Sequence, residues 1–438
     1  MHPAWAPSPP PAPGPPSAGE AAAPVAEGDR QPMVDALRAV ALLGIVVVNV
    51  AAYRRGVGPN LAAAGGRLGG EVDALTVGVS ALAEGRFYPL FSFMFGWGFA
   101  VQEARTRVRG RSVVGPWLRR AVVLAAFGLA HGLLLFDGDI LTAYAVIGVP
   151  LLLVRPLRPA WLAGLGVGLI VAQSLFTTGL VALAAVLTDP EGRGEAALRA
   201  DGLRELAADA RVYGDGSFVD VVGQRAGDLA VSFPLGLLSV GGTVAGMMCL
   251  GMATARVEWV DPRRWPRWLR SGIVPLWLAG LALSVPAAWL IGDTAFGSRD
   301  AGRSSASWLL YSLLGPAMAL LWAGVVLRAG EVRPLRRVLG AIAPAGRMSL
   351  TVYLSQSLVA SVVFNGYGLG LGDHLGIGAS VALAVALWVV QVGLAVVWFR
   401  FFTMGPLEAV ARAGAYLRWP AIRRRPAASP LAPAPGPG

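Results

Sequence analysis

Long stretches without charged residues recur along this chain and constrain its fold more than any other feature. Many of them approach or exceed ~18 residues, and a helix of that length crosses roughly 30 Å of hydrocarbon. The 438 residues are 55% hydrophobic and 14% charged, which leaves too few charges to cover a globule of this size in water. The sequence therefore predicts an all-α, polytopic integral membrane protein.

The apolar runs predict about ten membrane-spanning helices. We place them at 36–53, 84–103, 117–136, 139–154, 160–187, 228–255, 271–292, 307–328, 347–366 and 377–402. A shorter amphipathic segment is expected at 71–83. Residues 1–28 contain runs of proline without apolar periodicity, so we expect a disordered tail there, followed by a helical domain at 29–415. Residues 416–438 are basic and then proline-rich, and we expect a second tail.

The positive charge is carried by arginine and is concentrated in alternate connections between the predicted spans. A formal net charge of +11 would suggest nucleic acid as the partner of a soluble protein, but here the arginines lie in short loops without a basic and aromatic platform. The basic connections are those with Arg105 to Arg120, Arg155 and Arg158, Arg256 to Arg270, and Arg333 to Arg347. All fall on one side of a ten-span chain. The positive-inside rule makes that side the cytoplasm, with both termini inside, the lipid bilayer as partner and no nucleic acid.

Several common kinds of site have no signature in the sequence. Cys249 is the single cysteine and lies in an apolar run, which excludes an internal disulfide and a cysteine metal cluster. We find no phosphate-binding loop, zinc spacing, GxSxG elbow or dinucleotide fingerprint, and we expect no metal and no permanently bound cofactor. Any chemistry should use a histidine or a carboxylate at a membrane cavity.

His131 is the one histidine inside a predicted span and is the best candidate for a general base, because histidine exchanges a proton near physiological pH. It lies shortly before an outward turn that ends at Asp139, and Arg120 lies eleven residues earlier on the same helix face. Asp139 opens the next helix, where it either orients His131 or only caps the free amide groups. A histidine bonded to a carbonyl or to water at the interface is the alternative.

Polar side chains also form stripes on apolar helices, where lipid makes them costly. Asp35, Arg38 and Asn49 share one face of the first span. An ion pair between Asp35 and Arg38, with Asn49 bonding another helix, explains that stripe without any function.

A second set of polar residues lies near the end of the chain. Ser349, Tyr353 and Gln356 line one face of the ninth span, and Gln391 lies in the middle of the tenth. Such stripes either hold helices together or line a substrate path, and periodicity alone does not separate these interpretations.

Five segments of the chain form a recognisable set. They are Val34 to Arg38 with Asn49, Gly85 to Gly96, His131 with Gly138 to Tyr144, Gly346 to Ser357, and Gly405 to Glu408 with Arg412. Together they resemble the YeiB-type bacterial membrane proteins, whose C-terminal half is the domain of unknown function 418. The resemblance covers about residues 30–415, with that domain at about 230–415, and implies a location in the bacterial inner membrane.

The YeiB-type proteins are similar to integral-membrane acyltransferases, which implies an activity. An acyl group would pass from cytoplasmic acyl-CoA, as co-substrate, to a small-molecule, glycan or lipid acceptor at or beyond the membrane. A histidine often ends the first-helix motif of such enzymes, and Asn49 occupies that place here. Catalysis should therefore depend on His131, with Asp139 orienting it.

In this hypothesis the remaining polar residues bind the two substrates. Arg38, Arg120 and Arg347 would hold the donor phosphates, because the arginine fork suits phosphate geometry. The substrate path would be lined by Asp35, Asn49, Arg86, Tyr88, Ser349, Tyr353, Gln356 and Gln391. A transporter or exporter of a small organic anion, and an accessory subunit without chemistry, are the alternatives. The acceptor, the acyl chain and the oligomeric state are not predicted.

Overall fold

The computed structural model describes residues 31–55, 74–187, 195–257, 259, 261–294, 301–372 and 374–424. Within these residues the secondary structure is helical, apart from an isolated bridge between Phe402 and Arg423. The prediction of an all-α protein is confirmed. The tail predicted at 1–28 and the last part of the tail predicted at 416–438 lie outside the described residues.

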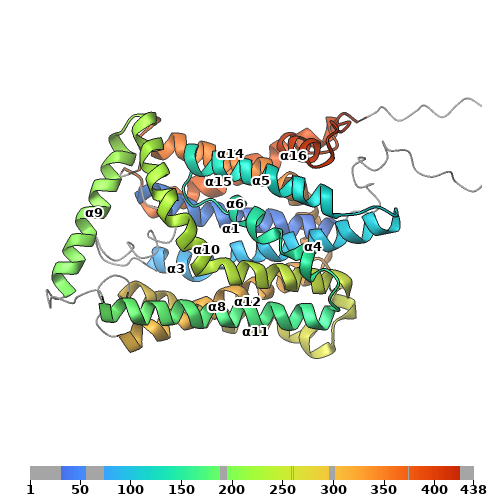
Figure 1. The fold of residues 1–438 in the computed structure, drawn as a ribbon, viewed down its shortest axis with the longest axis horizontal. Helices are drawn as coiled ribbons and strands as arrows, with labels where there is room; N and C mark the ends of the chain where they lie inside the picture. Colours follow the sequence, from blue (N-terminus) through green and yellow to red (C-terminus); the bar gives the residue numbers. More distant parts are fainter. Residues whose placement is uncertain are drawn as a thin grey trace, which may run out of the picture.

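Figure 1 labels most of the helices and shows several long ones, such as α8, α11 and α15, side by side along the horizontal axis. In chain order the described elements are α1 (Pro32–Arg55), α3 (Ala74–Leu82), α4 (Phe87–Val108), α5 (Val114–Leu134), α6 (Leu141–Gly148), α7 (Leu151–Val154), α8 (Pro159–Leu187), α9 (Glu195–Asp215), α10 (Phe218–Arg256), η3 (Pro262–Arg264), α11 (Arg267–Thr294), α12 (Ala301–Ala329), α13 (Arg333–Arg347), α14 (Ser349–Phe364), α15 (Ile377–Phe401) and α16 (Pro406–Tyr416).

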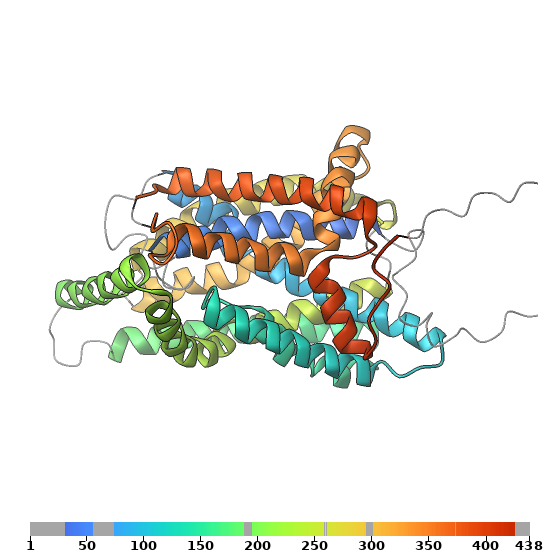
Figure 2. The ribbon, with the colours of Figure 1, turned by 90° about the horizontal axis from the view of Figure 1, so that it is seen from above.

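The first span lies between two groups of helices. In Figure 1 α14, α15 and α5 lie above α1, and α8, α11 and α12 lie below it. Helix α1 packs against α4, α13, α14 and α15, and its residues Ala36, Ala39 and Leu42 are completely buried. Helix α9 crosses one end of the bundle at a steep angle (Figure 1), and α16 lies across the opposite end (Figure 2).

Seven described helices are long and apolar enough to cross a membrane, namely α1, α5, α8, α10, α11, α12 and α15. The structure therefore supports a polytopic membrane protein but not the predicted count of ten. The second predicted span is α4, whose last turns carry Glu103, Arg105 and Arg107. The ninth is α14, an apolar helix of 16 residues.

The fourth predicted span, at 139–154, is broken into two short helices. Helix α6 ends at Gly148, and α7 has four residues and follows Pro150. Proline supplies no amide hydrogen to a helix and its ring clashes with the preceding turn, which explains the break.

Helix α10 begins ten residues before the predicted boundary at 228. The Ser217 hydroxyl accepts a hydrogen bond from the amide of Asp220, whose carboxylate accepts one from the Ser217 amide. This capping box starts a helix of 39 residues, roughly 58 Å long, which is more than a bilayer core requires. The early start places Arg225, which the prediction left in a connection, inside a packed helix.

Glycines allow the central helices to approach closely. A Cβ atom added to Gly96 of α4 would collide with the backbone of Met248, and one added to Gly251 of α10 would collide with the backbone of Phe93. Gly346 lies in the same way against the carbonyl of Asp35. Small residues at helix crossings are the usual means of packing in lipid, where burial of apolar surface does not drive helices together.

The end of α15 is covered by the chain that follows it. Pro406 begins α16, and the Glu408 carboxylate accepts hydrogen bonds from the amides of Leu350 and Thr351, 2.7 and 3.2 Å away, at the start of α14. Burial raises the pKa of Glu408, and its bond from the Thr351 side chain opposes that shift. The Arg424 amide donates to the Phe401 carbonyl, so residues up to 424 pack on the helical domain.

Candidate functional site

The candidate site lies at the connection from α5 to α6. His131 is in the last turn of α5. Its carbonyl accepts hydrogen bonds from the amides of both Leu135 and Phe136, and the helix ends there. The amide and the hydroxyl of Thr142 each donate to Oδ2 of Asp139, at 2.7 Å. Asp139 therefore stabilises the start of α6 with one carboxylate oxygen and keeps the other for a second partner.

That second partner is His131, and the chain of hydrogen bonds continues to a serine. Nδ1 of His131 lies 2.9 Å from Oδ1 of Asp139, and Nε2 lies 2.8 Å from Oγ of Ser357 on α14. Because a carboxylate only accepts, we assign the proton of the neutral ring to Nδ1, which leaves Nε2 to accept the Ser357 hydroxyl. The side chains of His131 and Asp139 are 0% and 2% exposed, so water does not compete for these bonds.

Neighbouring residues hold the side chains of Asp139, His131 and Ser357 in place. The ring of Tyr353 lies 4.9 Å from the His131 ring, measured between centroids. A Cβ atom added to Gly128, one turn before His131, would collide with the Asp139 carboxylate and the Thr142 hydroxyl. Glycine at this position creates the space in which Asp139 reaches His131.

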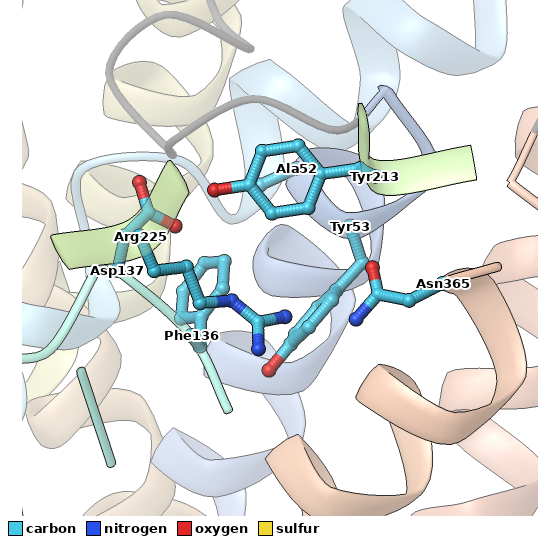
Figure 3. A pocket seen from close by; sticks show the side chains of 7 residues that line it. All are labelled: Ala52, Tyr53, Phe136, Asp137, Tyr213, Arg225 and Asn365. Carbon is cyan, nitrogen blue, oxygen red and sulfur yellow. The ribbon is translucent and has the colours of Figure 1, made fainter. Parts of the chain in front are cut away.

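A pocket adjoins the hydrogen-bonded side chains of Asp139, His131 and Ser357, at the α9 end of the bundle. It is lined by Ala52, Tyr53, Phe136, Asp137, Tyr213, Arg225 and Asn365 (Figure 3). The Tyr53 hydroxyl donates to the carbonyls of Leu135 and Ser357, at 3.0 and 3.2 Å, and its ring stacks on Phe136. Phe136 also contacts the His131 ring edge-on. Tyr53 and Phe136 therefore form the wall between the pocket and the His131 chain.

Arg225 is the cation of the pocket and is only 1% exposed. Its Nη1 donates to the Leu134 carbonyl at 2.8 Å, and its Nη2 donates to the Ser361 hydroxyl at 3.2 Å. Nε is buried and has no hydrogen-bond partner among the described residues. The guanidinium thus bonds neutral oxygens and keeps one donor available.

Two acidic groups set the electrostatics around Arg225. The pKa of Asp137 is raised to about 6, because burial and, to a smaller extent, like-charge repulsion from Asp228 outweigh the lowering by Arg225. Asp228 accepts the Tyr213 hydroxyl at 2.9 Å. Burial, with the neighbouring carboxylates, raises the pKa of Tyr213 and keeps it a neutral donor.

The predicted site residues separate into groups. The structure brings His131, Asp139 and Tyr353 together. Arg38 and Arg120 lie at the opposite end, since Arg120 precedes His131 by eleven residues, or roughly 16 Å of helix. Within the described chain, no three His, Cys, Asp or Glu side chains gather closely enough to hold a metal ion.

At that opposite end each arginine has local contacts. Arg38 pairs with Asp35 at 2.9 Å, which is the ion pair expected on the first helix. Arg120 donates to Gln102 at 3.3 Å and lies over the rings of Phe95 and Trp117. The guanidinium of Arg347 lies 3.9 Å from the Phe399 ring centre.

Other predicted path residues take structural positions. Gln356 donates to Gln391 at 3.0 Å, and Gln391 donates to Ser355 at 2.8 Å, which joins α14 to α15. Asn49 is half-buried and forms no hydrogen bond within the described residues, while Ser349 begins α14.

Arg86 and Tyr88 hold backbone together at the turn before α4. Buried Arg86 donates to the carbonyls of Ser80 and Glu84, which closes the turn from α3. The Tyr88 carbonyl accepts the Tyr144 hydroxyl at 3.0 Å.

Sequence reasoning missed Ser357, Tyr53, Gly128 and Arg225. Ser357 follows Tyr353 by four residues and so extends the stripe already seen on that span. Arg225 gave a weaker signal, because the helix that buries it was predicted to start after it.

The relatives of this chain are bacterial. The family described as protein of unknown function (DUF418) matches residues 254–418. The uncharacterized protein YxaH of Bacillus subtilis (strain 168) is 31% identical over 424 residues, which are 92% of this chain and 98% of YxaH. The uncharacterized protein YeiB of Escherichia coli (strain K12) is 28% identical over 87% of this chain and 94% of YeiB. No solved structure matches. Because similarity to YxaH and YeiB extends over nearly the whole chain, this protein belongs to the YeiB-type DUF418 family of membrane proteins.

Proposed function

We propose that this protein is a membrane acyltransferase in which His131 is the general base and Asp139 orients it. The observation that carries the proposal is the buried chain from Asp139 through His131 to a hydroxyl. A base within hydrogen-bond reach of a hydroxyl, with its second nitrogen held by a carboxylate, is the arrangement that activates oxygen nucleophiles.

The transfer balances without a metal or a redox partner. His131 Nε2 takes the proton of the attacking hydroxyl, the oxygen bonds to the thioester carbonyl carbon, and the carbon–sulfur bond breaks. The proton then passes from His131 to the departing CoA thiolate. The Asp139 carboxylate stabilises the imidazolium that forms between these two events.

The two substrates would approach from opposite ends. Arg38, Arg120 and Arg347 are the proposed phosphate contacts, and an acyl-CoA held there must extend its pantetheine arm along α5 toward His131. The acceptor would enter the pocket that contains Arg225 and Asp137. The wall formed by Tyr53 and Phe136 must then move to admit the acceptor, because it closes the pocket from His131.

The end of the bundle that carries Arg38, Arg120 and Arg347 is called the arginine-rich end. It would face the cytoplasm of a bacterial inner membrane. The start of α1 and α16 lie at that same end of the bundle (Figures 1 and 2), which agrees with both termini being cytoplasmic. Donor from the cytoplasm and acceptor from the other side would then both reach one site. The acceptor would be a small molecule, a glycan or a lipid.

The proposal is tested by adding acyl-CoA to everted membrane vesicles, whose cytoplasmic face is outward, and measuring the CoA that is released. Vesicles that contain the protein should release thiol from added radiolabelled acyl-CoA and accumulate acyl label in the membrane fraction. Vesicles without the protein, or with His131→Ala, should do neither. If the wild-type protein releases no CoA, yet moves a small organic anion at a rate that survives His131→Ala, the protein is a transporter and not an enzyme.

A further inference from the structure

We infer that Ser357 is the nucleophile of this site and carries the acyl group as a covalent ester between the two half-reactions. This inference rests on the proposed function and names the residue that accepts the acyl group first. It starts from an unusual feature of Ser357, which is the partner of its hydroxyl.

Several buried serines in these apolar helices bond their own helix, whereas Ser361, 1% exposed, donates to the Leu135 carbonyl and accepts from Arg225. Ser92, Ser174, Ser284 and Ser380 are all 0% exposed, and each donates to the carbonyl four residues earlier, at 2.7 to 3.1 Å. Such a bond satisfies a hydroxyl in an apolar environment without any neighbour. Ser357 is as deeply buried, at 2% exposed, but its Oγ lies 2.8 Å from Nε2 of His131. Its hydroxyl is therefore directed at a base instead of its own backbone.

Geometry around Ser357 meets the other requirements of a nucleophile. The base is itself held by Asp139 at 2.9 Å, so its free nitrogen points at the serine. The Tyr53 hydroxyl lies beside Ser357 and donates to its backbone carbonyl at 3.2 Å. For this hydroxyl to stabilise the oxyanion that forms when Ser357 attacks a carbonyl, its proton must turn away from the Leu135 and Ser357 carbonyls to which it now donates.

A covalent intermediate also suits a closed site that, in the proposed function, the donor and the acceptor approach from opposite ends. In the first half-reaction the Ser357 Oγ–H proton moves to His131, Oγ bonds to the acyl carbon, and the carbon–sulfur bond breaks to release CoA–SH. In the second, His131 takes a proton from the acceptor hydroxyl or amine, the acceptor displaces Oγ, and Ser357 regains its proton from His131. The donor can leave before the acceptor arrives, and burial protects the ester from water.

The experiment is a trapping measurement on the purified full-length protein in detergent. Incubation with radiolabelled short-chain or long-chain acyl-CoA, without acceptor, should label the protein with an alkali-sensitive ester, and peptide mapping by mass spectrometry should place it on Ser357. Ser357→Ala should abolish the label. Ser174→Ala is the matched control, because it removes an equally buried hydroxyl that bonds only its own helix, and it should label like the wild type.

His131→Ala should slow labelling by ~10²–10⁴-fold, because the base is lost while the serine remains. Tyr53→Phe should slow it less and leave the site of labelling unchanged. If everted vesicles transfer acyl groups while the purified protein gains no label on Ser357, and Ser357→Ala vesicles transfer normally, Ser357 is not the nucleophile although the protein is an acyltransferase. If neither transfer nor label is seen, the proposed function itself fails.

Discussion

Charged side chains are accommodated differently at the two ends of this helical bundle. At the arginine-rich end Arg256 pairs with Glu103 and also donates to backbone carbonyls, and these two side chains are 25% and 22% exposed. At the other end Arg225 is 1% exposed and bonds only neutral oxygens, beside the buried His131 chain. Dense charge in the connections indicates topology, whereas a buried charge must be satisfied by the protein, either structurally, as for Arg86 at the turn before α4, or beside a candidate site, as for Arg225.

The largest expected effect concerns the orientation of the two ends. Val219 and Ser112 are both exposed, and they lie at the α9 end and the arginine-rich end respectively. In intact cells an impermeant thiol reagent should label Val219→Cys and spare Ser112→Cys, and lysis should expose the latter. Native Cys249 is buried and should stay unlabelled. The reverse pattern would exchange the donor and acceptor sides of the proposal.

His131→Ala should lower acyl transfer by ~10²–10⁴-fold, the usual contribution of a general base. Thermal unfolding in detergent should be recorded alongside, so that loss of activity can be separated from loss of the fold. His374→Ala is the matched control, since His374 is exposed and its side chain forms none of the hydrogen bonds of the candidate site. Equal activity of the two variants would remove the general base from the mechanism.

Gly128→Ala should disturb the same end without touching a reacting group. The added methyl group would push the Asp139 carboxylate and the Thr142 hydroxyl away from α5, so that His131 loses its orientation. Displacement of about 1 Å at such a site reduces rates by roughly 10²-fold. Gly164→Ala, where the new methyl group meets no atom within 4 Å, should leave kcat unchanged. An unchanged kcat for Gly128→Ala would show that Asp139 need not hold the histidine.

Arg225→Gln and Arg256→Gln compare the two ends of one helix. If the acceptor enters beside Arg225, its loss should raise the KM for the acceptor by about 10-fold, equivalent to one charge-assisted hydrogen bond, and leave the KM for acyl-CoA unchanged. Arg256→Gln should alter neither constant. A rise in the KM for acyl-CoA with Arg225→Gln would instead place the donor at the α9 end.

The smallest expected effect concerns Asp137, whose titration should make the free energy of unfolding depend on pH. The groups around it are Arg225 and Asp228 on α10, Tyr213 on α9 and Tyr53 on α1. Its pKa of about 6, raised from 3.8, means that the folded state holds the proton more tightly. The contribution of Asp137 to the free energy of unfolding is therefore greatest below pH 4 and is lost as the pH rises through 6.

Asp137→Asn should accordingly stabilise the protein by ~3 kcal/mol above pH 6.5 and have little effect near pH 4. Tm measured in detergent against pH, for this variant and for Asp215→Asn at an exposed position, would separate burial from a general loss of negative charge. A constant Tm difference for Asp137→Asn across the range would contradict the buried carboxylate.

The sequence alone determined the helical class, the membrane environment and the general base candidate. Apolar length and arginine bias are local properties, so they can be read without knowing which helices meet. The pair of His131 and Asp139 was also within reach, because only a short turn separates the two residues.

Tertiary structure decided the rest. Ser357 meets His131 across 226 residues, and Tyr53 reaches Ser357 across 304, distances along the chain that no periodicity relates. Gln356 and Gln391, predicted to line a path, bond each other because α14 and α15 pack in a register that the sequence does not reveal. A polar side chain in lipid must find a partner, but which partner it finds depends on helix packing, and that is set by contacts between segments distant in the chain.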